Sequence, residues 1–431
     1  MAAAPIVTLA DIEAARARIH GRVRASPCTY SRSLSELLDK QVYLKLENLQ
    51  LTGSFKERGA CNRLLQLDAE ERLRGVVAAS AGNHAQGVAY HARALGVPAT
   101  IVMPRRSPLV KVTQTRSLGA EVTLVTGGYD EAFVEAERIA ATTGRVLIPG
   151  FDDPAVIAGQ GTIGLEILEQ VPDVDEVVVA IGGGGLIAGV ATALKESSLR
   201  PRPGEAAGPR LAGPGSSSVP TRGIHVCGVQ SEAMPSMRAA RQAGAPRRIE
   251  GVRTIADGIA VGQVGALPFA IAERYVDSIV TVDDEEIAEA ILILLEREKL
   301  VAEGAGAAPL AALIHRELPA DRKTIVLVIG GGNIDVNLLS RIIDRGLIKS
   351  GRIARLRVMV PDVPGSLARI LAIVAESEAN ILAIEHDRVG TRLEFGQASV
   401  EITAETRGFE HVAAIVATLH AAGLFTRAPT D

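Results

Sequence analysis

Lys56 lies in the run Leu51-Thr-Gly-Ser-Phe-Lys-Glu-Arg-Gly-Ala60, and its type and position suit covalent chemistry. Ser54 followed three residues later by Glu57 is a capping-box pattern, which predicts that a helix starts here with Lys56 in its first turn. The positive end of the helix dipole makes it easier for the amine to lose its proton. A neutral amine is a nucleophile that can form a Schiff base with a carbonyl group. The alternative is an exposed lysine that happens to fall near a helix cap.

Three glycine-rich turns could complete a binding site around this lysine. Each follows a predicted strand and precedes a predicted helix: Ser80-Ala-Gly-Asn-His-Ala-Gln-Gly87, Gly182-Gly-Gly-Gly-Leu186 and Gly330-Gly-Gly-Asn333. In parallel α/β sheets the carboxyl ends of the strands share one edge, and ligands bind there. We therefore expect the three turns to line one pocket.

The turn at 182–185 is the clearest candidate for an anion site. Four residues without Cβ let backbone N–H groups close on a phosphate, and the following helix adds its dipole. The turn is not a Walker loop, because the Gly-Lys-Ser/Thr ending is missing. It fits a dinucleotide fingerprint loosely, but the acidic partner would be Glu205, inside a proline-rich segment. A tight turn without a ligand is the alternative.

The elements that position these residues follow an α/β pattern. Between residues 75 and 345, helical patterns alternate with short apolar runs, which lie at 75–80, 99–103, 121–125, 175–181 and 324–329. Continuous apolar strands are buried on both faces, as in parallel sheets covered by helices. We therefore expect a doubly wound α/β catalytic domain over residues 1–348.

Two segments depart from this pattern. Residues 199–222 hold five prolines and four glycines, which predicts a mobile surface insertion before a strand at 223–229. Beyond a boundary near 346–353, the predicted order is strand, helix, strand, strand, helix and a short last strand, at 355–360, 366–378, 381–389, 392–403, 408–422 and 424–426. This order predicts a ferredoxin-like βαββαβ module over residues 354–431.

Composition narrows the classes of partner. The 46 Lys and Arg residues against 50 Asp and Glu give a net charge of −4, and tryptophan is absent, so nucleic acid is not an expected partner. No apolar stretch is long enough to span a bilayer, and the N-terminus lacks the basic region of a signal peptide. Cys28, Cys61 and Cys227 are too far apart to suggest a disulfide framework or a zinc site. We expect a cytoplasmic protein with reduced thiols and no membrane partner.

Together these residues resemble a known family. The runs Ser54–Ala60 and Ser80–His84 and the tetraglycine turn are similar to fold-type II pyridoxal-phosphate enzymes, and most similar to threonine dehydratases (threonine ammonia-lyases). The resemblance covers residues 5–348 and implies two lobes, the small one at about residues 53–146. The run Asp362-Val-Pro-Gly-Ser-Leu367 resembles ACT domains. Further motifs match the family in order, at Phe151–Ile163, Gly228–Glu232, Ile255–Val261 and Gly331–Asp335.

The resemblance implies a role for each candidate residue. Lys56 would hold pyridoxal 5′-phosphate through a Schiff base and later act as a base, Phe55 would pack beside the pyridine ring, and Asn83 would hydrogen-bond the phenolic oxygen. Gly330 matches the position that faces the pyridine nitrogen, where the family usually has a serine. Main-chain N–H groups would hold the phosphate at Gly182, Gly183, Gly184, Gly185 and Leu186. A helix N-terminus would receive the substrate carboxylate at Ser80, Ala81, Gly82 and His84.

By the same resemblance, the reaction is the deamination of a small hydroxy amino acid. L-threonine would lose its α-proton and then its β-hydroxyl, and hydrolysis of the enamine would release 2-oxobutanoate and ammonia; L-serine would give pyruvate. Serine racemase, a related enzyme, has a serine at the position of Ala81 that serves as a second acid/base, so we predict elimination without useful racemisation. Its divalent-metal ligands match Gln230, Met234 and Ser236, a poor set for a cation, so we predict no metal.

The ACT-like segment implies regulation by a small amino acid. Isoleucine or valine would bind at an interface between subunits of a homo-oligomer, either a dimer or a tetramer. Pro364 suits a first helical position, and Gly365 lets a ligand approach the backbone. The alternative is a module that only assists assembly.

Other functions stay open at this stage. A hydroxyaspartate dehydratase would need an extra cation for the second carboxylate, and Arg58 and Arg116 are the candidates. A serine racemase-like enzyme and a non-catalytic amino-acid sensor are further alternatives. The carboxylates of Asp257, Glu303 and Asp335 lie near glycine-rich turns and could face the pocket, but we expect them to stabilise those turns by capping N–H groups.

Overall fold

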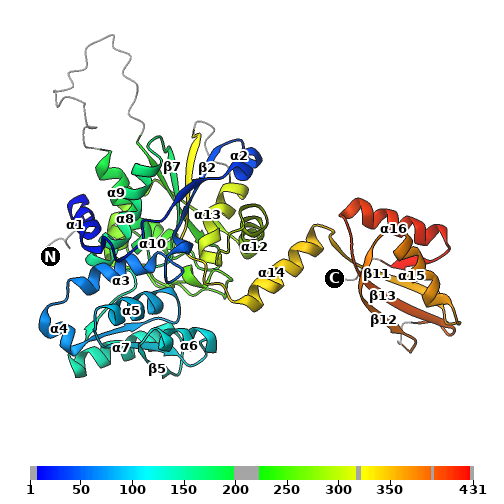
Figure 1. Cartoon of the computed structure of the whole chain (residues 1–431), viewed down its shortest axis with the longest axis horizontal. Coiled ribbons are helices and arrows are strands. Elements are labelled where there is room, and N and C mark those ends of the chain that lie inside the picture. Colours follow the sequence, from blue (N-terminus) through cyan, green and yellow to red (C-terminus); the bar gives the residue numbers. More distant parts are fainter. Residues whose placement is uncertain (1–6, 199–222, 317–321, 390–392, 428–431) are drawn as a thin grey trace, which may run out of the picture. The chain divides into compact units, whose positions relative to one another are not determined.

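The computed structural model describes residues 7–198, 223–316, 322–389 and 393–427. The predicted insertion at 199–222 lies outside these residues. Contacts divide the chain into two compact units, Met1–Ile334 and Asp335–Asp431 (Figure 1). The helix α14 (Val336–Lys349) is thereby grouped with the second unit, although the sequence pattern changes near 346–353.

The larger sheet of the first unit has six strands in the order β1-β2-β10-β7-β8-β9. All neighbouring strands are parallel except β1 and β2. The central strand β10 is buried at every position, as its unbroken apolar sequence predicts. The strands are β1 (Cys28–Tyr30), β2 (Gln41–Leu46), β7 (Glu176–Ala180), β8 (His225–Ser231), β9 (Ser278–Val282) and β10 (Thr324–Ile329).

Different helices cover the two faces of this sheet. Val177, Val179, Val326 and Val328 share one apolar cluster with α1, α8, α9, α10 and α11. Helix α13 contacts the same strands but is not part of that cluster, so it lies on the opposite face. The helices of this lobe are α1 (Leu9–Ile19), α2 (Arg32–Leu38), α8 (Pro154–Gln170), α9 (Gly185–Ser197), α10 (Ser236–Ala243), α11 (Ala266–Tyr275), α12 (Asp284–Ile293) and α13 (Gly304–His315).

The smaller sheet is parallel throughout, in the order β5-β4-β3-β6. Val76 and Ala78 of β3 pack against α3 and α5, whereas Val77 and Ala79 pack against α7, so helices cover both faces. The elements are α3 (Lys56–Leu65), α4 (Ala69–Arg74), β3 (Val76–Ala79), α5 (Asn83–Ala94), β4 (Ala99–Pro104), α6 (Leu109–Ser117), β5 (Glu121–Val125), α7 (Tyr129–Thr143) and β6 (Val146–Leu147). The predicted two-lobed, doubly wound α/β fold is confirmed.

The predicted helix at Lys56 exists, but the predicted capping box is wrong. Helix α3 begins at Lys56 without a side-chain cap, because the carboxylate of Glu57 instead accepts hydrogen bonds from the N–H and hydroxyl of Thr52. Ser54 forms a β-bridge with Gly331, and the N–H of Phe55 donates to the carbonyl of Gly330 at 3.0 Å. Pairing with a distant turn therefore overrides the local cap and ties the lysine segment to the larger lobe.

The second unit contains an antiparallel sheet in the order β12-β13-β11-β14. This is the strand order of the predicted ferredoxin-like module, which is confirmed. Helix α15 begins at Ser366, and Gly365 is its N-cap with φ of 95°, so Pro364 lies before the helix and not at its first position as predicted. The elements are β11 (Ile353–Pro361), α15 (Ser366–Glu376), β12 (Asn380–Asp387), β13 (Gln397–Glu405), α16 (Phe409–Ala421) and β14 (Phe425–Arg427).

Candidate active site

A cavity of about 1240 Å³ lies between the two lobes of the first unit. The three glycine-rich turns meet there, but they follow strands of two different sheets: the turn after β3 belongs to the smaller sheet, and the turns after β7 and β10 belong to the larger one. The expectation of a single sheet edge was therefore wrong, although the three turns do line one cavity. The lining includes all the predicted site residues, which are Phe55, Lys56, Ser80, Ala81, Gly82, Asn83, His84, Gly182, Gly183, Gly184, Gly185, Leu186 and Gly330.

Lys56 is the first residue of α3, and its side chain lines this cavity. Its Nζ donates a hydrogen bond to the carbonyl of Gly150 at 2.6 Å and lies 5.3 Å from the ring centroid of Phe55. Burial lowers the pKa of Lys56 to about 8, although the nearby carboxyl of Glu303 acts in the opposite direction. A substantial fraction of the amine is therefore neutral near pH 8 and able to attack a carbonyl group.

The tetraglycine turn opens α9 with unused backbone donors. Gly184 is the N-cap with φ of 95°, a conformation that strains any L side chain, and no side chain caps the helix. A Cβ on Gly183 would lie 2.3 Å from the ring of Phe151. Within the described part of the chain, the N–H groups of residues 182–187 donate to no acceptor. This group of free donors at a helix N-terminus fits a phosphate.

Asn83 begins α5 and belongs to a polar network that spans the cavity. Its Oδ1 accepts a hydrogen bond from Asn333 at 2.7 Å, and its Nδ2 donates to Glu303 at 2.6 Å. An amide carries two N–H groups, so one donor of Asn83 stays available for a ligand. The predicted contact with a ring oxygen is compatible with this arrangement.

Glu303 was missed as a site residue. The sequence suggested a turn-capping carboxylate, but Glu303 makes no side-chain cap at the start of α13 and instead binds Asn83 inside the cavity. Burial, and then the charge of Asp257, raise its pKa to about 7. A signal was present in the sequence, because Glu303 is the single charged residue in the run from Leu300 to Ile314.

The other two carboxylates of this group differ from each other. Asp335 caps α14 as predicted, since its side chain accepts from the N–H of Asn337. Asp257 forms an ion pair with Lys111 at 2.8 Å, and both residues line the cavity. Asp257 therefore links α6 of the smaller lobe to the larger lobe.

His84 is buried in the cavity wall and stays neutral. Its Nε2 donates to the carbonyl of Ile148 at 2.9 Å, while its Nδ1 has no partner in the described part of the chain. Burial, and then the charge of Lys56, lower its pKa to about 4. In this tautomer the ring has no N–H left to offer a carboxylate.

The start of α5 keeps free backbone donors instead. Ser80 accepts a hydrogen bond from the N–H of Gly82 at 3.2 Å, which fixes the turn. The N–H groups of Asn83 and His84 have no acceptor among the described residues. These N–H groups are therefore the better candidates for binding a carboxylate here.

Ala81 and Gly330 are lining positions that offer no polar side chain. Ala81 contributes a methyl group to the smaller-lobe wall, and Gly330 contributes backbone to the larger-lobe wall. A Cβ on Gly330 would lie 3.4 Å from the ring of Phe55. Neither position can supply a hydroxyl for proton transfer or for a hydrogen bond to a ring nitrogen.

The cations around the cavity are engaged. Arg58 is 1% exposed and binds Glu47 at 2.8 Å and Glu166 at 2.6 Å, so it belongs to a buried network and not to the cavity. Among the described lining residues, Lys111 and Arg248 are paired with Asp257 and Asp130. Arg116 of α6 does not line the cavity.

Two of the residues that match the metal ligands of serine racemase contact each other, since the Nε2 of Gln230 donates to the hydroxyl of Ser236 at 3.5 Å. Gln230 and Ser236 are buried, and the Oε1 of Gln230 accepts from the N–H of Arg238 at 2.9 Å. Within the described residues, no group of three or more His, Cys, Asp or Glu side chains could hold a metal ion. No helix of the described residues is both long and apolar enough to cross a bilayer.

Comparison with known proteins places this geometry in context. Residues 19–331 match the family model described as "Pyridoxal-phosphate dependent enzyme", and residues 354–423 match the ACT domain model. The chain is 49% identical over 422 residues to the L-threonine ammonia-lyase of Thermotoga maritima, an alignment that covers 98% of this chain and 99% of the relative.

Solved structures of similar proteins include a threonine deaminase and a serine racemase. Threonine deaminase isoform 2 from Solanum lycopersicum is 34% identical with a TM-score of 0.69, over 78% of this chain and 91% of that one. Maize serine racemase is 31% identical with a TM-score of 0.70, over 80% of this chain and 99% of that one. Similarity of fold alone therefore does not separate elimination from racemisation.

Proposed function

Because this chain belongs to the family of pyridoxal-phosphate dependent enzymes and carries an ACT domain, we propose that it is a lyase that deaminates L-threonine to 2-oxobutanoate and ammonia, and L-serine to pyruvate. The observation that carries the proposal is the shared cavity, where the buried amine of Lys56 meets the free N–H groups of residues 182–186. The nearly full-length likeness to an L-threonine ammonia-lyase supports the choice of substrate.

The residues of the cavity fit pyridoxal 5′-phosphate. Lys56 supplies the amine for its carbonyl group, the donors at 182–186 suit its phosphate, and Asn83 keeps an N–H for its phenolic oxygen. Phe55 supplies an aromatic wall between Lys56 and Gly330. When bound, the cofactor stabilises the negative charge that develops on the substrate α-carbon.

The chain's own residues then handle the carboxylate and the proton. The N–H groups at the start of α5 bind the substrate α-carboxylate, which suits the positive end of the helix. The amine of Lys56 takes the α-proton, since its lowered pKa matches a base that works near neutral pH. Glu303 orients the amide of Asn83 through their hydrogen bond of 2.6 Å. Ala81 exchanges no proton, so the product leaves by elimination.

Serine racemisation is the second candidate, because the fold is similar to that of maize serine racemase. The methyl group of Ala81 argues against it. A hydroxyaspartate dehydratase is disfavoured because Lys111 and Arg248, which line the cavity, are already paired with carboxylates. A non-catalytic sensor would have no use for a buried amine with a lowered pKa.

One set of assays separates these functions. Purified protein supplied with pyridoxal 5′-phosphate is given L-threonine, L-serine or 3-hydroxyaspartate, and the release of keto acid and of D-serine is measured. We expect 2-oxobutanoate from threonine and pyruvate from serine. D-serine formation at a rate comparable to pyruvate release would replace the proposal with the second candidate, and release from 3-hydroxyaspartate alone would replace it with a dicarboxylate enzyme.

We further infer that the second unit binds a small apolar amino acid such as isoleucine or valine, in a homo-oligomer of two or four chains in the cytoplasm. The match of residues 354–423 to the ACT domain supports the effector, and the free thiols of Cys28, Cys61 and Cys227 support a reducing compartment. Calorimetry of the full-length protein with isoleucine tests the effector. Absence of heat at millimolar isoleucine and valine would leave the module a role in assembly.

A further inference from the structure

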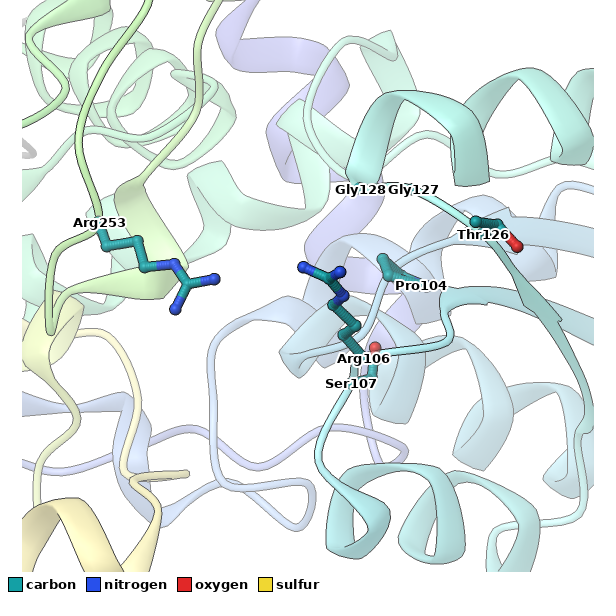
Figure 2. Close-up of a pocket in the computed structure, with 7 residues that line it drawn as sticks. All are labelled: Pro104, Arg106, Ser107, Thr126, Gly127, Gly128 and Arg253. Carbon is teal, nitrogen blue, oxygen red and sulfur yellow. The ribbon is translucent and has the colours of Figure 1, made fainter.

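A second cavity, of about 570 Å³, lies beside the first one between the same two lobes. Part of its wall comes from the ends of β4 and β5 in the smaller lobe, and the rest comes from the loop before Asp257 in the larger lobe (Figure 2). Its lining residues are Pro104, Arg106, Ser107, Thr126, Gly127, Gly128 and Arg253. None of them takes part in the proposed reaction.

Two arginines from opposite lobes face each other here. In Figure 2 the guanidinium groups of Arg106 and Arg253 point toward one another across the opening. Neither side chain forms a hydrogen bond or ion pair with another described residue. Two positive charges that face each other without a counter-ion repel, whereas an anion between them would attract both.

The neighbouring contacts between the lobes are complementary. Arg248 of the same loop pairs with Asp130 at the start of α7, and Lys111 of α6 pairs with Asp257. The Arg106–Arg253 position is therefore the exception in a row of charge pairs that joins the lobes. A negative group bound there would complete the row.

Two acidic residues of the smaller lobe beside this position are already engaged. Asp130 is held by Arg248, and the carboxylate of Glu131 accepts the N–H of Gly128 at 2.7 Å. Ser107, by contrast, has a buried hydroxyl oxygen without a partner in the described part of the chain. An anion in the cavity could accept a hydrogen bond from that hydroxyl as well as from both arginines.

Both arginines lie on anchored backbone. The N–H of Arg105 donates to Val125 at 2.7 Å, and that of Ser107 donates to Pro104 at 2.9 Å. On the other side, Thr254 and Ile255 both donate to the carboxylate of Asp284. The backbone that carries each arginine is thus fixed before any ligand arrives, so binding has to order only the two exposed side chains.

We propose that this cavity binds a compact phosphate dianion between Arg106 and Arg253. Arginine donates paired hydrogen bonds that match the oxygens of a phosphate, and two arginines balance a charge of about −2. The ligand is inorganic phosphate or the phosphate group of a small phosphate monoester. Because its two arginines come from different lobes, the bound anion holds together the same lobes that enclose the substrate cavity, and it couples to substrate binding.

The test is calorimetry of the full-length protein saturated with pyridoxal 5′-phosphate, at constant ionic strength. The probes are inorganic phosphate and glycerol 3-phosphate. We expect the Kd to rise about tenfold in Arg106→Gln and in Arg253→Gln, because each variant loses a charge-assisted donor, and to rise further in the double variant. Tighter binding of glycerol 3-phosphate identifies a monoester as the ligand, and equal binding identifies free phosphate.

Arg105→Gln is the matched control, because it removes the same charge from an exposed neighbouring residue that does not line the cavity. Its Kd should change less than about twofold. Thermal unfolding provides a second measurement: both anions should raise the Tm of the wild type but not of the double variant. Absence of heat with both probes at about 10 mM, or equal weakening in Arg105→Gln and the two lining variants, would overturn the proposal.

Discussion

The two walls of the substrate cavity use different chemistry. The smaller-lobe wall presents side chains at the starts of α3 and α5, where Lys56 and Asn83 are the first helical residues. The larger-lobe wall presents mainly backbone, at the tetraglycine turn before α9 and at Gly330 after β10. The difference indicates that the smaller lobe carries the reactive groups, while the larger lobe holds a ligand by its phosphate.

The hydrogen bond between Asn83 and Glu303 crosses from one wall to the other. Glu303 is a charged side chain of the larger lobe, and it contacts the amide of Asn83 on the smaller lobe. The two walls are therefore coupled, and substitutions on each wall should fail in different ways.

The largest effect is expected on the smaller-lobe wall. Lys56→Ala removes both the amine that binds the carbonyl group and the base, so turnover should fall by about 10⁴-fold or more. The visible absorbance of the cofactor–lysine imine should disappear as well. Lys111→Ala, which removes a lysine that is paired with Asp257 in the same cavity, should keep that absorbance. Retained turnover in Lys56→Ala without added amine would remove the basis of the proposed function.

The next largest effect is expected on the larger-lobe wall. Gly183→Ala places a methyl group 2.3 Å from the ring of Phe151, so the turn must shift and its N–H groups lose their common direction. Overpacking of this kind costs about 1–3 kcal/mol, which corresponds to a cofactor affinity weakened about fivefold to 150-fold. Fluorescence titration of the cofactor-free protein with pyridoxal 5′-phosphate measures this change.

Gly82→Ala is the matched control on the opposite wall. Gly82 has a negative φ of −130°, outside the left-handed region that favours glycine, and no atom lies within 4 Å of a Cβ at this position. The cofactor affinity of this variant should change by less than about threefold. If Gly82→Ala weakened the cofactor as much as Gly183→Ala, the division of labour between the two walls would be wrong.

A smaller effect is expected where the walls are coupled. Glu303→Gln keeps a hydrogen-bond acceptor for Asn83 but loses the negative charge, so kcat at pH 8 should fall about tenfold. In the wild type, kcat should rise through the pKa of Glu303 at about 7, because the ionised carboxylate is the stronger acceptor. A rate–pH profile in which the variant keeps this rise would assign it to another group, such as Lys56.

Ionisation of Glu303 should also affect the stability of the folded protein, but in the opposite direction to its effect on kcat. The pKa of Glu303 is raised from 4.5 to about 7 in the folded protein, so between these values the folded state holds a proton that the unfolded chain has lost. Wild-type stability should therefore decrease as the pH rises from 4.5 to 7, relative to Glu303→Gln. Paired Tm measurements across this window give the sign directly.

The sequence was sufficient for the features that depend on local pattern. Unbroken apolar runs predicted strands that the structure places at β3, β4, β5, β7 and β10, with ends shifted by a few residues. Glycine-rich turns at the ends of three of these strands then identified the residues that meet in the cavity. Strand ends in a parallel sheet gather ligands at one edge, which is why the residues were identified, but the sequence did not show that the three turns belong to two sheets.

The features that depend on distant partners were not accessible in this way. Glu303 binds Asn83, 220 positions away in the chain, so its local surroundings suggested a cap and not a site residue. Ser54 forms its bridge with Gly331, and the expected capping box was lost to that contact. The tautomer of His84 depends on the carbonyl of Ile148, which only the packed structure brings near.

The smallest effect, a gain, tests the smaller-lobe wall at Ala81. This residue lines the cavity next to the donors at the start of α5, yet its methyl group cannot carry a proton. Ala81→Ser adds a hydroxyl that can donate a proton to the substrate α-carbon, so D-serine formation from L-serine should rise about tenfold above a low wild-type rate, while pyruvate release falls less than about threefold. Chiral chromatography of the reaction mixture measures both products.

Ala81→Val is the control, because it adds volume without a proton, and it should slow elimination without forming D-serine. If D-serine already forms as fast as pyruvate in the wild type, another side chain of the cavity supplies the second proton, and the smaller-lobe wall then has a reactive group beyond Lys56.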